Sequence, residues 1–146
     1  MSKTLSFRGK IAEGLEERIK LSTIKGKRGY KITKFETMST AIGNTNFETI
    51  TKIYSKSQGS GSTTVDFTES DLLGVSYIED NHDPAYPSSV QIIFDNEVFN
   101  QDIYVTSAGH TGTTPTNYYI ELETVALTDI QATQLTLKNL RNIASR

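Results

Sequence analysis

The sequence predicts an all-β fold: an antiparallel β-sandwich of the jelly-roll kind, followed by one C-terminal helix. Short apolar runs are separated by turn-forming residues about every ten positions, a spacing typical of sandwiches and barrels. Threonine, which is β-branched and suits a pleated surface, is abundant. The last segment changes to helical spacing behind a capping sequence. The 146 residues correspond to one ordinary domain.

Seven or eight strands are expected, because seven segments show the alternation or the compact apolar composition of strands. These segments are 15–24, 30–38, 47–55, 72–78, 90–94, 102–106 and 117–125. The first two are expected to pair as a hairpin around the glycine-containing turn 24–29, with a β-bulge near Lys34 and Phe35. Surface loops are expected at 41–46, 58–62, 79–89 and 107–116, and 58–62 is expected to be flexible.

The C-terminal helix is expected over residues 129–144. Thr128 and Gln131 have the spacing of a capping box, and Leu127 with Ala132 has the spacing of a hydrophobic staple. One apolar stripe at helical spacing contains Ile130, Leu137, Leu140, Ile143 and Ala144, and Leu135 falls off it. The helix is expected to pack on the sandwich, or instead to dock on a neighbouring subunit.

Charge is distributed unevenly along the chain. Residues 1–34 carry ten Lys or Arg against three Glu, a local net charge of +7. Residues 35–126 carry two Lys against thirteen acids, a net charge of -11, and the last twenty residues return +2, for a total of -2. This pattern fits two solvated faces of opposite sign, or a basic region that contacts nucleic acid or the acidic surface of a neighbouring copy. Aromatic residues are not interleaved with the basic ones, so protein contact is favoured over nucleic acid.

Three parts of the chain follow from these observations: a basic N-terminal arm over 1–14, the sandwich over 15–126 and the helix over 127–146. Segment 1–34 is expected to reach across an interface in a homo-oligomer or repeated array. The candidate interface residues are Phe7, Arg8, Lys10, Ile11, Lys25, Lys27 and Arg28.

Catalytic and metal chemistry are not indicated by the sequence. The absence of cysteine excludes a thiolate metal site and a cysteine nucleophile. His82 and His110 both fall in predicted loops, and no G-x-S-x-G elbow occurs, so a serine triad is not favoured. The acidic segment 79–83 lacks the spacing and central glycine of an EF-hand, and the glycines of 58–62 lack the Lys-Ser/Thr of a phosphate loop. We expect a protein that is not an enzyme and that has no cofactor, no metal and no small-molecule substrate.

No segment indicates a membrane or secretory protein. The N-terminus has no apolar stretch of signal-peptide length. No window approaches the ~18 apolar residues of a membrane span. Synthesis in a cytoplasm and no membrane partner are therefore expected.

Three stretches carry a resemblance to known proteins. They read FRGKIA with GYKITKF (7–12 and 29–35), IFDNEVFNQDIY (93–104) and NYYIELE (117–123), the last followed by the capped helix. Together they resemble a group of small, little-characterised proteins encoded by marine bacteriophages. The resemblance covers most of the chain, and it implies a virion component, for which a sandwich or jelly roll is a common unit.

The resemblance and the residue pattern lead to one expected function and three alternatives. We expect a capsid-associated cement, decoration or minor coat protein, made in the host cytoplasm and located in the virion, with its own copies and other capsid proteins as partners. The first alternative is a receptor- or glycan-binding module of a spike or tail, with its site on loops 79–89 and 107–116. A nucleic-acid-binding role for residues 1–34 and a small enzyme are the remaining alternatives.

Overall fold

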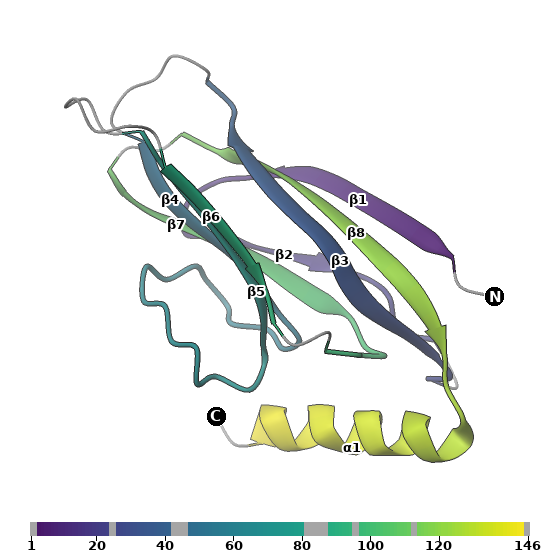
Figure 1. Ribbon diagram of the computed structural model, residues 1–146. Helices are drawn as coiled ribbons and strands as arrows, with labels where there is room; N and C mark the ends of the chain where they lie inside the picture. Colours follow the sequence, from purple (N-terminus) through teal and green to yellow (C-terminus); the bar gives the residue numbers. More distant parts are fainter. Residues whose placement is uncertain are drawn as a thin grey trace.

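The computed structural model describes residues 3–23, 26–41, 47–80, 88–94, 97–111 and 114–144. Within these ranges the chain forms eight strands and one helix: β1 (Thr4–Ile11), β2 (Glu16–Ile19), β3 (Arg28–Ser39), β4 (Phe47–Tyr54), β5 (Leu72–Asp80), β6 (Ser88–Ile93), β7 (Ile103–Thr111), β8 (Thr116–Ala126) and α1 (Asp129–Ala144). The strands form two antiparallel sheets in the orders β1-β8-β3 and β2-β7-β4-β5-β6. The sheets face each other and α1 lies across one end (Figure 1). The predicted all-β sandwich with a C-terminal helix is confirmed, whereas its jelly-roll type is not.

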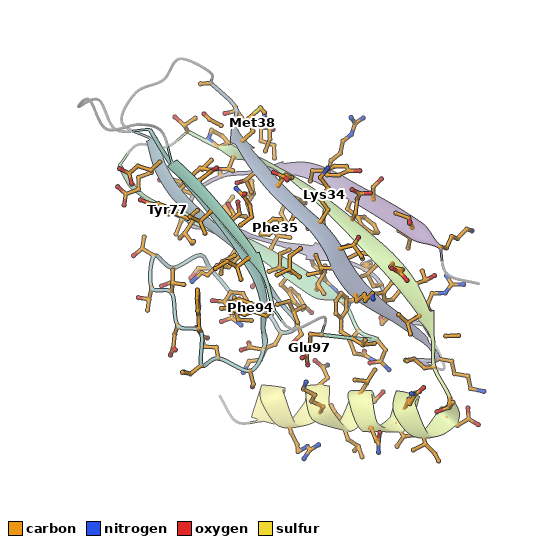
Figure 2. The ribbon with its side chains drawn as sticks, viewed as in Figure 1. Lys34, Phe35, Met38, Tyr77, Phe94 and Glu97 are labelled. Atoms are coloured by element: carbon orange, nitrogen blue, oxygen red, sulfur yellow. The ribbon has the colours of Figure 1, made fainter. Side chains whose placement is uncertain are left out.

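The main core lies between the two sheets, because alternation along the strands turns one face of each sheet inward. In β8, Tyr118, Ile120 and Leu122 are buried, while the residues between them are more exposed. Figure 2 shows Phe35 between the sheets and its neighbour Lys34 on the outer face. The buried cluster comprises Ile11, Ile19, Leu21, Tyr30, Ile32, Phe35, Ile53, Leu73, Phe99, Ile103, Val105, Tyr118, Ile120 and Leu122.

The β-bulge expected near Lys34 and Phe35 is present in β3. The register with β8 shifts between Ile32 and Lys34, so Thr33 is the extra residue. Because of this extra residue, Ile32 and Phe35 both reach the core although they are three positions apart. The prediction is confirmed, with the bulge immediately before the expected position.

The predicted hairpin between 15–24 and 30–38 is wrong. The first segment contains only the short strand β2, which pairs with β7 in the five-stranded sheet, whereas β3 pairs with β8 in the other sheet. Residues 20–27 therefore connect the two sheets. The bridge between Tyr30 and Phe99 then joins β3 to the segment that precedes β7. The glycines suggested a tight turn, but strand pairing across the whole chain decided the connection.

The N-terminal segment is part of the sandwich where the structure describes it. Thr4–Ile11 forms β1, which pairs antiparallel with β8 along its whole length. The expectation of a separate arm over residues 1–14 is therefore corrected: most of this segment is an edge strand. Leu5, Phe7 and Ile11 alternate with polar residues in β1. The basic charge of the segment nevertheless favoured the interpretation as an arm.

One predicted loop is corrected, a second is confirmed as a loop, and the other two lie largely outside the described residues. Residues 107–111 continue β7 instead of forming a loop. Residues 55–71, which we call the strap, include the predicted flexible loop 58–62 and cover the outer face of the five-stranded sheet. The turn 41–46 and most of loop 79–89 lie outside the described residues.

The strap is held on the sheet by polar and apolar contacts. Lys52 on β4 is buried, and its Nζ donates to the Thr64 carbonyl oxygen at 2.5 Å. Glu16 accepts hydrogen bonds from the backbone N–H groups of Gln58 at 2.5 Å and Gly59 at 3.1 Å. Beneath the strap, a second apolar cluster forms from Ile50, Tyr54, Leu72, Val75 and Ala108. These contacts hold the glycine- and serine-rich segment against the sheet.

The capping box of α1 is confirmed in both directions. The Gln131 backbone N–H donates to Thr128 Oγ1 at 3.2 Å, and the Thr128 N–H donates to Gln131 Oε1 at 3.0 Å. The helix extends over Asp129–Ala144, as predicted. These two hydrogen bonds satisfy backbone groups that would otherwise lack partners at the helix start.

The orientation of α1 differs from the expectation that its apolar stripe packs on the sandwich. Ala132 is buried against the sandwich, and Leu135, which falls off the stripe, lines a cavity together with Leu73 and Phe99. The buried Asn100 side chain explains this orientation, because its Nδ2 donates to Thr136 Oγ1 at 3.3 Å and to the Gly26 carbonyl oxygen at 2.9 Å. The helix thus presents small and polar side chains to a polar anchor on the sandwich.

Candidate interaction surfaces

The outer face of α1 carries an apolar stripe that is largely exposed to solvent. Ile130, Leu137 and Leu140 are 71%, 52% and 56% exposed. We call these three residues the outward stripe; the side chains of Ile143 and Ala144, which the sequence placed with them, lie outside the described residues. Exposed apolar side chains grouped on one helix face are typical of a protein contact.

A basic groove lies beside the start of α1. It has a volume of about 520 Å³, and Lys3, Lys27 and Arg28 contribute to its walls together with the end of β8. Lys27 is paired with Asp129 of α1, with 2.9 Å between Nζ and Oδ1. Two of the candidate interface residues, Lys27 and Arg28, therefore meet in this groove, while Lys25 lies outside the described residues.

The four candidate interface residues of the N-terminal segment point to opposite faces of β1. Arg8 and Lys10 are exposed on the outer face, whereas Phe7 is half-buried against the core. Ile11 is only 1% exposed, so it belongs to the core of its own chain. This is a correction, because Ile11 was expected to provide apolar contact with a neighbour.

Charges that are far apart in the sequence lie close together within one molecule. The acidic strand β8 lies between the basic strands β1 and β3, with Lys31 opposite Glu123 and Lys34 opposite Glu121. Arg18 also pairs with Asp102 across 84 positions of sequence. The basic and acidic regions thus meet in the same chain, and their separation in sequence does not by itself indicate a contact between copies.

A polar pocket of about 290 Å³ lies where β2, the start of β7 and α1 meet. We call it the Arg18 pocket. The Arg18 Nε donates to Asp102 Oδ2 at 2.6 Å, and Asp102 Oδ1 accepts from the backbone N–H groups of Leu21 at 2.7 Å and Ser22 at 2.8 Å. Burial opposes ionisation of Asp102, but these N–H groups and the Arg18 guanidinium outweigh it and lower the pKa of the carboxyl to about 2.

The interior at the far end from α1 is lined by hydroxyl groups. Thr37 on β3 and Ser76 on β5 share a hydrogen bond of 2.6 Å between the sheets, so Ser76 faces inward. Thr51 lies directly opposite both Ser76 and Ser107, which places all three on the same face. The buried hydroxyl oxygens of Thr49, Thr51, Ser107 and Thr116 have no hydrogen-bond partner among the described residues. Such groups lower the stability of this end of the sandwich.

One carboxyl group lies near this hydroxyl-lined end. Burial raises the pKa of Glu13, and its Oε1 has no hydrogen-bond partner in the part of the chain that the structure describes. A Cβ at Gly109 would overlap this carboxyl, so the glycine leaves room for it. Burial thus opposes ionisation of this carboxyl group.

The described residues contain no group of three His, Cys, Asp or Glu side chains that could hold a metal ion. His82 lies outside them, as does most of the acidic segment 79–83, and the side chain of His110 is not described. No helix in the described ranges is both long enough and apolar enough to span a membrane. The candidate surfaces are therefore the outward stripe, the basic groove and the Arg18 pocket.

Comparison with known proteins adds no family to this description. No protein-family model matches the chain, and the search of curated proteins found no match.

Sequence reasoning missed the Arg18 pocket and the outward direction of the apolar stripe. The pocket has no local motif, because its residues come from four separate parts of the chain. These are β2 with the residues after it, the strap, the start of β7 with the residues before it, and α1. The helical spacing of the sequence predicted the apolar stripe. Spacing alone does not determine which surface the stripe contacts. The polar residues Thr136 and Asn139 on the opposite face were the available signal.

Proposed function

We propose that this chain is a structural protein of a bacteriophage virion, a capsid-associated cement, decoration or minor coat protein. The single observation that supports it best is the outward stripe of α1. A helix that turns its polar face to its own domain and its apolar residues outward is suited to docking on another protein. The sequence resemblance to small marine phage proteins provides the setting. The protein is not an enzyme in this proposal.

The occupant of the outward stripe is a neighbouring capsid subunit. Three exposed side chains bury too little area for a stable isolated complex, since specific interfaces bury roughly 1,200–2,000 Å² in total. On a particle surface, however, the same weak contact is repeated many times, and a protein that also associates with its own copies gains avidity. The basic groove next to the start of α1 adds attraction for an acidic subunit surface.

The experiment compares incorporation of variants into virions of the phage that encodes the chain. Mass spectrometry of gradient-purified particles should detect the wild-type protein. The double substitution Ile130→Glu with Leu137→Glu should reduce incorporation more than tenfold, because two charges would be buried at the contact, on the order of 1.4 kcal/mol per tenfold. The melting temperature should stay unchanged, since both side chains are exposed.

Met38→Glu is the matched control. Met38 is 60% exposed and lies at the end of the sandwich far from α1 (Figure 2). This variant should enter virions normally. Absence of the wild-type protein from virions would contradict the virion function. Normal incorporation of the double variant would contradict the outward stripe as the attachment surface.

A further inference from the structure

The Arg18 pocket has the chemistry of a binding site for a ligand, and this inference goes beyond attachment to a capsid. It opens to solvent on the side of the molecule where β2, β7 and α1 meet. We propose that it binds an acidic saccharide, a sugar that carries a carboxylate group. The site differs from loops 79–89 and 107–116, where the sequence placed a glycan-binding alternative.

The Arg18 guanidinium is oriented before a ligand arrives. Asp102, whose side chain is 6% exposed, holds Nε and one terminal nitrogen of the guanidinium. The Arg18 side chain is 54% exposed, and a guanidinium has five N–H donors, so donors remain for a second carboxylate. A planar guanidinium held in this way suits paired hydrogen bonds to an oxyanion.

The pocket also offers more donors than acceptors. Asp102 accepts from Arg18 and from the backbone N–H groups of Leu21 and Ser22, so its oxygens are already engaged. The Arg18 guanidinium keeps unused N–H donors beside a carboxylate that is already engaged, which favours an anionic ligand over a neutral one.

The remaining lining residues suit the hydroxyl groups and ring of a sugar. Tyr104 is partly exposed and presents an aromatic surface beside Arg18. Gln101 and Asn139 bring amide groups, which both donate and accept hydrogen bonds. A bare phosphate or sulfate ion would leave the aromatic ring and the amide oxygens unused. A saccharide would use the guanidinium, the amides and the aromatic ring together.

The site is complete only when α1 is docked. Asn139 is on the same side of α1 as Thr136, which accepts from Asn100, and Lys138 pairs with Glu97 of the sandwich. Figure 2 shows Glu97 beside the helix. A ligand that contacts both Arg18 and Asn139 would join α1 to β2 and stabilise the docked helix.

The test uses the full-length protein and three probes: an oligogalacturonate tetramer, the neutral maltotetraose and inorganic phosphate. Heteronuclear NMR should show saturable shifts at Arg18, Gln101, Tyr104 and Asn139 with the oligogalacturonate. Maltotetraose and phosphate should each bind at least about tenfold more weakly, because each lacks part of the recognised chemistry. The melting temperature should rise with the acidic sugar only.

Two variants separate recognition from folding. Arg18→Lys keeps a cation beside Asp102 but removes the paired donors, so affinity for oligogalacturonate should fall about tenfold. Asn139→Ala should lower the affinity severalfold. The matched controls are Arg8→Lys on the outer face of β1 and Gln134→Ala on the outer side of α1, both exposed, which should bind as the wild type does.

Several results would overturn the proposal. They are no binding of the acidic sugar, equal binding of maltotetraose, equal binding of phosphate, or unchanged affinity in Arg18→Lys. These outcomes are independent of virion attachment, because the outward stripe lies on the opposite side of α1 from Asn139. A protein that enters virions without binding the sugar would contradict this inference alone.

Discussion

The two ends of the sandwich interior differ in whether their buried polar groups have hydrogen-bond partners. At the end covered by α1, the core is apolar, and the buried Asp102 and Asn100 have hydrogen-bond partners. At the far end, inward-facing hydroxyls line both sheets, and four of them lack hydrogen-bond partners within the described ranges. Packing at the end near α1 therefore stabilises the fold. The other end contains buried hydroxyl groups that contribute no hydrogen bonds to stability. This difference predicts that α1 closes the more stable end of the molecule.

The largest loss of stability is expected from a substitution in the apolar end. Leu122 is fully buried, so Leu122→Ala should remove transfer free energy and leave a cavity, lowering the free energy of unfolding by about 3 kcal/mol. Urea unfolding would measure the change. Val90→Ala, at a position 50% exposed, is the control and should change stability little. A loss below about 1 kcal/mol for Leu122→Ala would show that this end is loosely packed.

Substitution of Asp102 should have the next largest effect on the free energy of unfolding. This residue should also make the stability depend on pH. Asp102→Asn should lower the free energy of unfolding at neutral pH by about 2 kcal/mol, because a charge-assisted partner of Arg18 and of two backbone N–H groups is weakened. Its pKa is lowered to about 2 in the folded state, against ~3.9 when unfolded. This stabilisation is present above the unfolded value and is lost as the pH falls from about 4 to about 2.

Unfolding at a series of pH values would check this prediction. The wild type should lose more stability between those two pH values than Asp102→Asn does. Glu36→Gln, at an exposed site on β3, should follow the wild-type curve. Parallel curves for the wild type and Asp102→Asn would mean that Asp102 is not what stabilises the end covered by α1.

The helix cap at the start of α1 should contribute less to the free energy of unfolding than Asp102 does. Thr128→Ala removes the acceptor of the Gln131 N–H and should lower stability by about 1 kcal/mol, the usual effect of a lost helix cap. Thr133→Ala, at an exposed position within the helix, is the comparison. An unchanged unfolding midpoint for Thr128→Ala would show that α1 unfolds separately from the sandwich.

At the hydroxyl-lined end, replacing an unpartnered buried hydroxyl should raise the free energy of unfolding instead of lowering it. Thr51→Val replaces an unpartnered buried hydroxyl with a methyl group of similar size and should raise stability by up to about 1 kcal/mol. Thr37→Val removes a hydroxyl that is hydrogen-bonded to Ser76 and should lower it by a similar amount. Thermal unfolding would measure both. Destabilisation by Thr51→Val would show that this hydroxyl has a partner and that the two ends are alike.

The strands and the helix could be predicted where a local pattern was strong. The β3 bulge and the capping box of α1 both depend on residues within a few positions of each other, and both are confirmed. Pairing of β2 with β7 was not predictable in this way, because its partner lies more than 80 positions away. The same distance separates Arg18 from Asp102, so the pocket they form left no motif in the sequence.

The sequence by itself determined the all-β class, the extent of α1 and its cap, because these follow from local periodicity and short-range hydrogen bonds. The tertiary structure alone decided that Thr4–Ile11 joins the sandwich, that Ile11 belongs to the core, and that α1 turns Ile130 and Leu137 outward. Periodicity shows which residues share a face, but not what covers that face. For α1 this was decided by a buried asparagine, Asn100, whose hydrogen bonds require the polar side of the helix.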